Sequence, residues 1–153
     1  MATVEYSAVI ATTAEHAWKV LRNFGEIAQW HPAINESSLE DGQSESTIGS
    51  VRRLDLADGG VLRERLLVLD NPQMRLTYKF EESPLPLDNY RADVRVIKVS
   101  GELQCVIEWR ASSDVRDAEM TAHFEALITR LVVDGHDSLA LYLAQSRTCK
   151  DGH

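Results

Sequence analysis

The sequence predicts an α+β fold in which a curved, seven-stranded antiparallel sheet wraps around one long C-terminal helix. Three features of the chain support this prediction. Apolar residues recur at steps of three and four between residues 118 and 145, which is typical of an amphipathic helix. Six strand-like segments joined by short turns precede that stretch. A further strand, followed directly by two short helices, begins the chain.

The C-terminal stretch predicts a helix roughly 40 Å long, at about 1.5 Å per residue. Its apolar stripe contains Met120, Phe124, Leu127, Ile128, Leu131, Gly135, Leu139, Tyr142 and Leu143. A helix of this length needs a broad apolar surface against which to pack, and the strands upstream are the elements that can supply one. We therefore expect the sheet to curl around the helix.

The first strand is expected over residues 3–11, where apolar and polar residues alternate. Thr12 or Thr13 can cap the short helix that follows. The apolar positions of this helix are Ala14, Ala17, Trp18 and Leu21. Gly25 interrupts it, and residues 26–30 can add one more turn before Pro32. The two short helices are expected to form a corner that holds one end of the long helix.

The other six strands are expected to form an antiparallel meander, because they follow one another through short turns. They cover residues 34–39, 49–56, 61–70, 74–80, 90–99 and 103–111. The sequence of residues 58–60, Asp-Gly-Gly, is typical of a hairpin turn, and two prolines within residues 83–87 indicate a loop. On two of the strands, the inward faces are predicted to carry Leu62, Glu64, Leu66 and Val68, and Leu103, Cys105, Ile107 and Trp109.

Composition limits the classes of protein to which this chain can belong. Its 153 residues, 44% of them apolar, suit a single domain that spans residues 1–153. Sixteen basic and 24 acidic residues give a net charge of −8, which argues against a nucleic-acid partner. Cys105 and Cys149 form neither a disulfide framework nor a metal-binding spacing, so we expect no metal and no cofactor.

The usual signals for export or membrane insertion are not visible in the sequence. The first residues, MATVEYSAV, do not combine a basic start with an apolar run, so no signal peptide is predicted. No apolar run approaches the ~20 residues that span a bilayer. The sequence therefore predicts a cytoplasmic protein without an integral membrane segment. It leaves open whether that protein is a monomer or a homodimer.

The order of the elements, with FGEIAQWHPAI after the first helix, resembles the Bet v 1-like or START-like (SRPBCC) superfamily. Within it, the chain resembles the bacterial polyketide cyclase/dehydrase and lipid-transport group, including MxaD-like proteins. The resemblance spans nearly the whole chain. It rests on Trp30, Pro32 and the stretches GSVRRLDLADGGVLRERLLVLD, MRLTYKF, PLPLDNYRADVRV and VIEWRA. It implies a helix-grip fold with an apolar pocket beneath the long helix, but no single activity, because the superfamily includes carriers, receptors and cyclases.

Arg52 and Glu64 lie on the apolar faces of two strands that the predicted hairpin joins. If residues 58–60 all lie in the loop, Arg52 is opposite Leu66, and Glu64 is its diagonal neighbour on the same face. A two-residue loop would instead place Arg65 or Leu67 there. An unpaired charge in an apolar cavity is costly, so Arg52 and Glu64 are expected to pair or to contact a ligand.

Three residues are candidates for catalysis. Arg52 can stabilise a carboxylate, phenolate or enolate oxygen of a ligand while Glu64 exchanges protons; the alternative is a purely structural ion pair. His31 is restricted to extended geometry by Pro32. The resemblance places it near the mouth of the cavity, where it can act as an acid or base; the alternative is a solvated or core-edge histidine.

Aromatic and aliphatic residues are candidates for contact with a ligand, although plain core packing is the alternative for each of them. The candidates are Trp30, Tyr78, Tyr90, Trp109, Phe124, Ile128 and Leu131. Gly135 weakens a helix interior by about 1 kcal/mol relative to alanine. It can leave room for a ligand, or for close packing by Trp18 or a strand.

Three functions are compatible with these residues. The first is the binding of a small hydrophobic molecule, such as a lipid, polyketide, isoprenoid or aromatic compound, in a buried pocket. The second is a polyketide cyclase or dehydratase that uses Arg52, Glu64 and His31 in the same pocket. The third is a module that docks on another protein through an exposed apolar patch. Binding is preferred, because the ionisable residues form no recognisable catalytic constellation.

Overall fold

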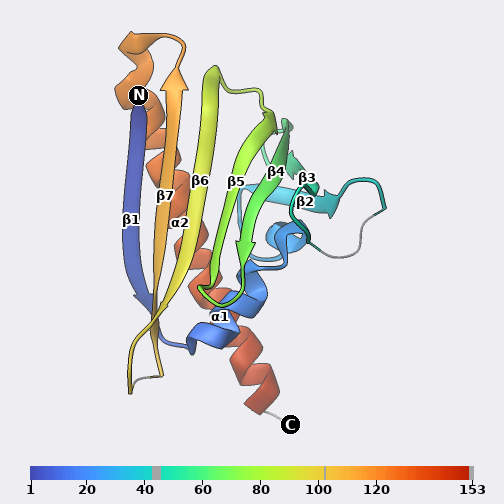
Figure 1. The fold of residues 1–153 in the computed structure, drawn as a ribbon, viewed down its shortest axis with the longest axis vertical. Helices are drawn as coiled ribbons and strands as arrows, with labels where there is room; N and C mark the ends of the chain where they lie inside the picture. Colours follow the sequence, from blue (N-terminus) through green and yellow to red (C-terminus); the bar gives the residue numbers. More distant parts are fainter. Residues whose placement is uncertain (43–45, 102, 152–153) are drawn as a thin grey trace.

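The computed structural model describes the backbone of residues 1–42, 46–101 and 103–151, with side chains up to residue 145. Over these residues, a seven-stranded antiparallel sheet curves around the long helix α2, as the sequence predicts (Figure 1). The strand order is β1-β7-β6-β5-β4-β3-β2, so β2 to β7 form the predicted meander and β1 lies beside β7. The predicted α+β fold is therefore confirmed.

The elements follow the predicted order, with one short 3-10 turn before the final helix. Their bounds are β1 (Ala2–Ile10), α1 (Ala14–Leu21), η1 (Phe24–Gln29), β2 (Ile34–Leu39), β3 (Val51–Leu56), β4 (Val61–Asp70), β5 (Arg75–Glu82), β6 (Leu87–Lys98), β7 (Cys105–Val115), η2 (Ala118–Met120) and α2 (Thr121–Asp151).

Helix α1 forms where the sequence predicts it. Thr13, rather than Thr12, is its cap, because the Thr13 side-chain oxygen accepts a hydrogen bond from the His16 backbone N–H at 3.2 Å. The residues that α1 buries are the predicted Ala14, Ala17, Trp18 and Leu21. These four residues form one apolar face, through which the short helix packs against the core.

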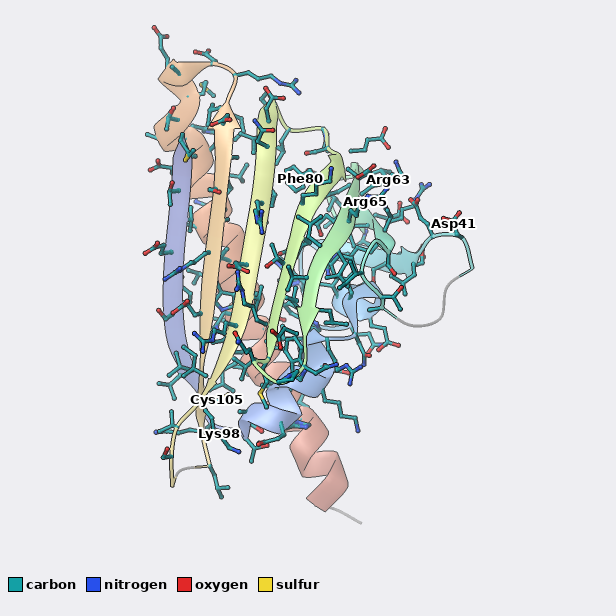
Figure 2. The ribbon with its side chains drawn as sticks, viewed as in Figure 1. Asp41, Arg63, Arg65, Phe80, Lys98 and Cys105 are labelled. Carbon is teal, nitrogen blue, oxygen red and sulfur yellow. The ribbon has the colours of Figure 1, made fainter. Side chains whose placement is uncertain are left out.

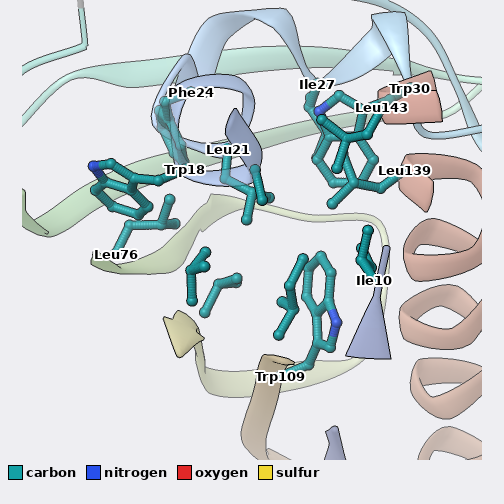
Figure 3. Close-up of a cluster of buried hydrophobic side chains, with 14 of the residues drawn as sticks. Ile10, Trp18, Leu21, Phe24, Ile27, Trp30, Leu76, Trp109, Leu139 and Leu143 are labelled. Carbon is teal, nitrogen blue, oxygen red and sulfur yellow. The ribbon is translucent and has the colours of Figure 1, made fainter. Parts of the chain in front are cut away.

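The corner formed by α1 and η1 holds one part of α2, as expected. Ile27 and Trp30 belong to the same buried cluster as Leu143, and the three side chains lie together in Figure 3. The Tyr142 hydroxyl also donates a hydrogen bond to the Gln29 side-chain oxygen at 3.0 Å. The corner therefore fixes the position of α2 relative to the sheet.

The start of the long helix differs from the prediction. Residues Ala118–Met120 form a 3-10 turn, in which the Asp117 side chain accepts a hydrogen bond from the Glu119 backbone N–H at 3.1 Å. Met120 is 38% exposed, so it does not belong to the buried stripe in which we had placed it. The cap at Asp117 starts this turn early and displaces Met120 from the face that α2 presents to the sheet.

Among the strands, the bounds of β6 and β7 differ most from the prediction. Leu87, which we assigned to the loop before β6, is the first residue of that strand and is buried. Leu103, which we expected to face inward, lies outside β7 and is 68% exposed. Strand β7 instead continues to Val115, where Leu87 pairs with it. Pairing between β6 and β7 therefore extends further at this end than the local sequence indicates.

The hairpin between β3 and β4 has a register two residues away from the predicted one. Arg52 lies directly opposite Glu64, rather than opposite Leu66. The loop consists of residues 57–59, since the Leu56 backbone N–H bonds to the Gly60 carbonyl at 2.8 Å. Gly59 supplies the positive φ, +94°, that this turn requires. A shift of two residues keeps every side chain on its predicted face.

A β-bulge near the end of β4 changes which side chains face the core. Leu66 pairs with Tyr78 but Val68 pairs with Thr77, so Leu67 is an extra residue on this strand. As a result, Leu69 rather than Val68 packs against the core. Our assignment of Val68 to the inward face was therefore wrong, because a bulge interrupts the period-two pattern.

Two structural features are absent from the described residues. None of their helices is long and apolar enough to cross a bilayer. No group of three or more histidine, cysteine, aspartate or glutamate side chains among them is arranged to hold a metal ion.

Candidate functional site

A cavity of about 320 Å³ lies between the sheet and α2. Strands β3 to β7 supply one wall, and α2 together with the corner after η1 supplies the other; most of the lining surface is apolar. At one end the lining includes the exposed residues Asp58 and Pro84, so this end is the nearest to solvent. Arg52 and Glu64, both buried, line the inner part.

Arg52 and Glu64 form a buried ion pair in the cavity wall. The Arg52 Nε donates to Glu64 Oε1 at 2.8 Å, and Nη2 lies 2.6 Å from the same oxygen. The two side chains are only 4% and 5% exposed. The Arg52 Nη1 also donates to the Phe24 carbonyl at 3.0 Å, and the guanidinium lies 3.9 Å from the centre of the Phe24 ring. The Arg52 guanidinium is therefore held by the Glu64 carboxylate, the Phe24 carbonyl and the Phe24 ring.

The residues on either side of Glu64 along β4 face outward. Arg63 pairs with Glu40, and Arg65 pairs with Glu81; Figure 2 labels both arginines. Because successive strand side chains point to opposite faces, Glu64 is the charged residue of this run that reaches the interior. The period-two pattern thus explains why one acidic residue lies in an apolar cavity between two solvated arginines.

Burial alters the protonation of the groups in this wall. It raises the pKa of Glu64, while the Arg52 charge and hydrogen bonds act in the opposite direction. Burial, aided by the nearby Glu64, also raises the pKa of Tyr78 to about 12. The pKa of Tyr90 is raised for the same main reason. Both phenols are therefore protonated near neutral pH and can donate hydrogen bonds.

Both ring nitrogens of His31 are engaged by the backbone. Nε2 donates to the Leu131 carbonyl on α2 at 3.1 Å, and Nδ1 accepts from the Ala33 N–H at 3.2 Å. Burial is the main cause that lowers the pKa of His31, so the neutral ring is favoured. Proton transfer by His31 would break one of these two bonds. The geometry therefore favours a structural role for His31. Its ring links the corner after η1 to α2, and we call this link the His31 latch.

Aromatic rings form much of the cavity wall. The Trp30 and Trp109 rings lie 6.3 Å apart, and Phe80 stacks on Tyr90 at 3.8 Å between ring centres. The Trp109 indole N–H donates to His136 Nδ1 at 3.0 Å. Because His136 does not line the cavity, the indole nitrogen has a protein partner and needs none from a ligand. The wall thus offers flat apolar surfaces to whatever occupies the space.

Comparison with known families decides the family of this chain. The family described as "Polyketide cyclase / dehydrase and lipid transport" matches residues 1–144. The chain belongs to this family. No curated protein matches it at a significant level.

Solved structures agree with the fold of this polyketide cyclase/dehydrase family member. The XoxI protein from Bacillus cereus is 24% identical, with a TM-score of 0.83 over 96% of this chain and 99% of that one. A protein from Thermobifida fusca is 29% identical, with a TM-score of 0.82 and coverage of 95% of both chains. A START superfamily protein from Mycobacterium smegmatis, at 14% identity, has a TM-score of 0.77 over 94% and 97%. The fold is therefore START-like.

The cavity of this family member brings together most of the residues that the sequence singled out. All the candidates for catalysis and ligand contact line it except one: these are His31, Arg52, Glu64, Trp30, Tyr78, Tyr90, Trp109, Ile128 and Leu131. Phe124 is the exception. It is buried in a second cluster with Val4, Leu87 and Ala111, and it is not among the residues that line the cavity. Its neighbour one helical turn on, Leu127, takes the place in the wall that we had assigned to it.

Several lining residues were not singled out from the sequence. Leu54 and Leu62 share the faces of Arg52 and Glu64, so their strand parity would have indicated them. Leu85 comes from the loop between β5 and β6. A loop residue shows no periodic pattern, and only the folded chain shows that this loop reaches the cavity.

Gly135 allows the His31 latch to form. A Cβ at this position would lie 2.8 Å from two atoms of the His31 ring. Glycine to alanine in a helix interior normally stabilises a protein by about 1 kcal/mol. We expect Gly135→Ala instead to destabilise it by about 1–3 kcal/mol, because the ring must move and lose its bond to Leu131. Urea denaturation measures the change.

A double variant identifies the cause of this effect. In a His31→Ala background, Gly135→Ala should cost less, since no ring opposes the new methyl group. A Gly135→Ala protein more stable than the parent would show that His31 does not pack against α2 in this way.

Proposed function

We propose that this protein binds one small hydrophobic molecule in the cavity between the sheet and α2. The observation that carries the proposal is the cavity itself, about 320 Å³ in volume and mostly apolar, with aromatic rings along its walls. Ligand pockets usually begin at about 300 Å³ and are lined by apolar side chains with a few polar groups. Membership in a family described as cyclases, dehydrases and lipid transporters is consistent with a hydrophobic ligand.

A cavity-filling substitution tests this proposal. Leu131 lines the cavity from α2, so Leu131→Trp should occupy the space and weaken binding of biphenyl, used as an apolar probe, by about tenfold or more. Equilibrium dialysis gives the affinity. Leu141→Trp is the matched control: Leu141 is on the same helix but 67% exposed, and its replacement should leave binding unchanged. Failure of the parent protein to bind biphenyl, or equal binding by both variants, would contradict the proposal.

A second candidate function is a cyclase or dehydratase that acts in the same cavity. The observation that favours it is the position of Glu64, whose pKa burial raises, next to the Arg52 guanidinium. In such an enzyme Arg52 would stabilise an enolate while Glu64 moves the proton. Turnover of a polyketone, with a rate that Glu64→Gln lowers while substrate affinity is kept, would favour the enzyme over the carrier.

A further inference from the structure

The buried end of the cavity contains an acceptor that the protein itself leaves open. Both interactions between Arg52 and Glu64 end on Oε1. Among the described residues, neither of these contacts reaches Glu64 Oε2, and this oxygen is not one of the fully enclosed side-chain atoms that lack a partner. Buried carboxylate oxygens are normally hydrogen-bonded. Because Glu64 lines the cavity, an occupant with a donor group can satisfy this oxygen.

The charges around this acceptor already balance. Arg52 and Glu64 together sum to zero, and Arg52 Nη1 is committed to the Phe24 carbonyl. The other titratable groups near Glu64 are the phenols of Tyr78 and Tyr90 and the ring of His31. All three are neutral near pH 7, for the reasons given above.

The remaining described residues of the lining add no cation. Of these residues, those on α2 are apolar or glycine, and the charged residue at the outer end, Asp58, is acidic. A ligand carboxylate would therefore find no unpaired positive charge among the described residues that line the cavity. It would lie beside Glu64 in a site with little water, where two like charges repel strongly unless one takes up a proton.

Building on the proposed function, we propose that the cavity selects ligands whose inner end is an uncharged hydroxyl group, phenolic or enolic, that donates a hydrogen bond to Glu64 Oε2. The same arrangement discriminates against ligands of equal shape that end in a carboxylate. A hydroxyl donor adds a charge-assisted hydrogen bond without adding charge. The Tyr78 and Tyr90 hydroxyls, which line the same cavity, can donate in turn to the oxygen of the ligand.

Three probes that share one apolar body test this inference. They are biphenyl, para-hydroxybiphenyl and biphenyl-para-carboxylic acid, compared by equilibrium dialysis at about pH 7, where the phenol is neutral and the acid is ionised. We expect para-hydroxybiphenyl to bind about tenfold or more tightly than the carboxylate, and more tightly than biphenyl. Calorimetry in two buffers of different ionisation enthalpy should show that the carboxylate takes up about one proton on binding and that the phenol takes up none.

A variant of Glu64 identifies the residue responsible. Glu64→Gln keeps the size of the side chain but leaves Arg52 without a counter-charge, so the preference should shift by about tenfold or more towards the carboxylate. Glu81→Gln is the matched control, because Glu81 pairs with Arg65 on the outer face and should not alter the ranking. If Glu64→Gln does not fold, as judged by circular dichroism, the calorimetric measurement of proton uptake by the parent protein decides the test.

The outcomes separate this inference from the proposed function. If the parent protein binds biphenyl but binds the carboxylate as tightly as the phenol and without proton uptake, the selectivity is overturned and hydrophobic binding stands. If none of the three probes binds, the proposed function is overturned and the selectivity with it.

Discussion

Replacement of Glu64 by alanine is expected to destabilise the protein by about 3–5 kcal/mol, because it leaves a buried guanidinium without its counter-charge. The Arg52 side chain is only 4% exposed, and Glu64 is its ion-pair partner at 2.6 Å. The Phe24 carbonyl and ring stay in place, but they cannot neutralise a full charge. The shift in the midpoint of urea denaturation measures the loss.

Two controls separate burial from the pairing itself. Glu81→Ala breaks a comparable pair with Arg65 on the outer face and should cost at most about 1 kcal/mol, since water screens exposed pairs. The double variant Arg52→Met with Glu64→Leu should recover most of the loss, because it removes both charges and keeps the volume. If Glu64→Ala costs no more than Glu81→Ala, Arg52 reaches water in solution and the inner end of the cavity is not as described.

Replacement of Trp109 by alanine is also expected to cost about 3–5 kcal/mol. Its ring is buried between the sheet and α2, lies 6.3 Å from Trp30, and donates its N–H to the buried His136. Trp109→Ala removes the packing and leaves His136 without its donor. Trp109→Phe keeps most of the packing and should cost only about 1–3 kcal/mol, the penalty for a buried acceptor left unpaired.

The cost of Trp109→Ala also measures how tightly this wall is packed. A loss below about 2 kcal/mol would mean that the ring borders open space on most of its surface, since the cost of a truncation depends on the packing around the removed atoms. Thermal denaturation followed by circular dichroism gives the value. Such a result would contradict the placement of Trp109 in the buried cluster that also contains Leu139 and Leu143.

The inner face of the sheet was predictable from the sequence because strand side chains alternate with a fixed period of two. Arg52, Glu64, Tyr78 and Trp109 were placed on the correct face by that rule, although none of them lies close to another in sequence. The exact pairing was not predictable. It depends on whether the turn closes at Gly59 or Gly60, and both residues tolerate the backbone that a tight hairpin needs.

Other features depend on contacts between distant parts of the chain. The His31 ring bonds to Leu131, one hundred residues further on, and Gly135 makes room for that ring. From the sequence, Gly135 could equally have admitted a ligand or a strand. Phe124 and Leu127 lie on the same predicted stripe of α2. The position of the helix along the sheet decides that Leu127 reaches the cavity while Phe124 packs in the second cluster without lining the cavity.

The bulge in β4 is a further feature that local pattern does not indicate. Val68 and Leu69 are both apolar, so alternation cannot tell which of them faces the core once an extra residue enters the strand. The pairing of β4 with β5 settles the choice in favour of Leu69.

A crystal structure of the protein with para-hydroxybiphenyl tests the central claim most directly. We predict electron density for one molecule in the cavity, with its rings between Trp109 and the α2 residues Ile128 and Leu131, and with its hydroxyl within hydrogen-bond distance of Glu64 Oε2. Density confined to the outer surface, or side chains that fill the space beneath α2 and leave no room for a ligand, would contradict the account.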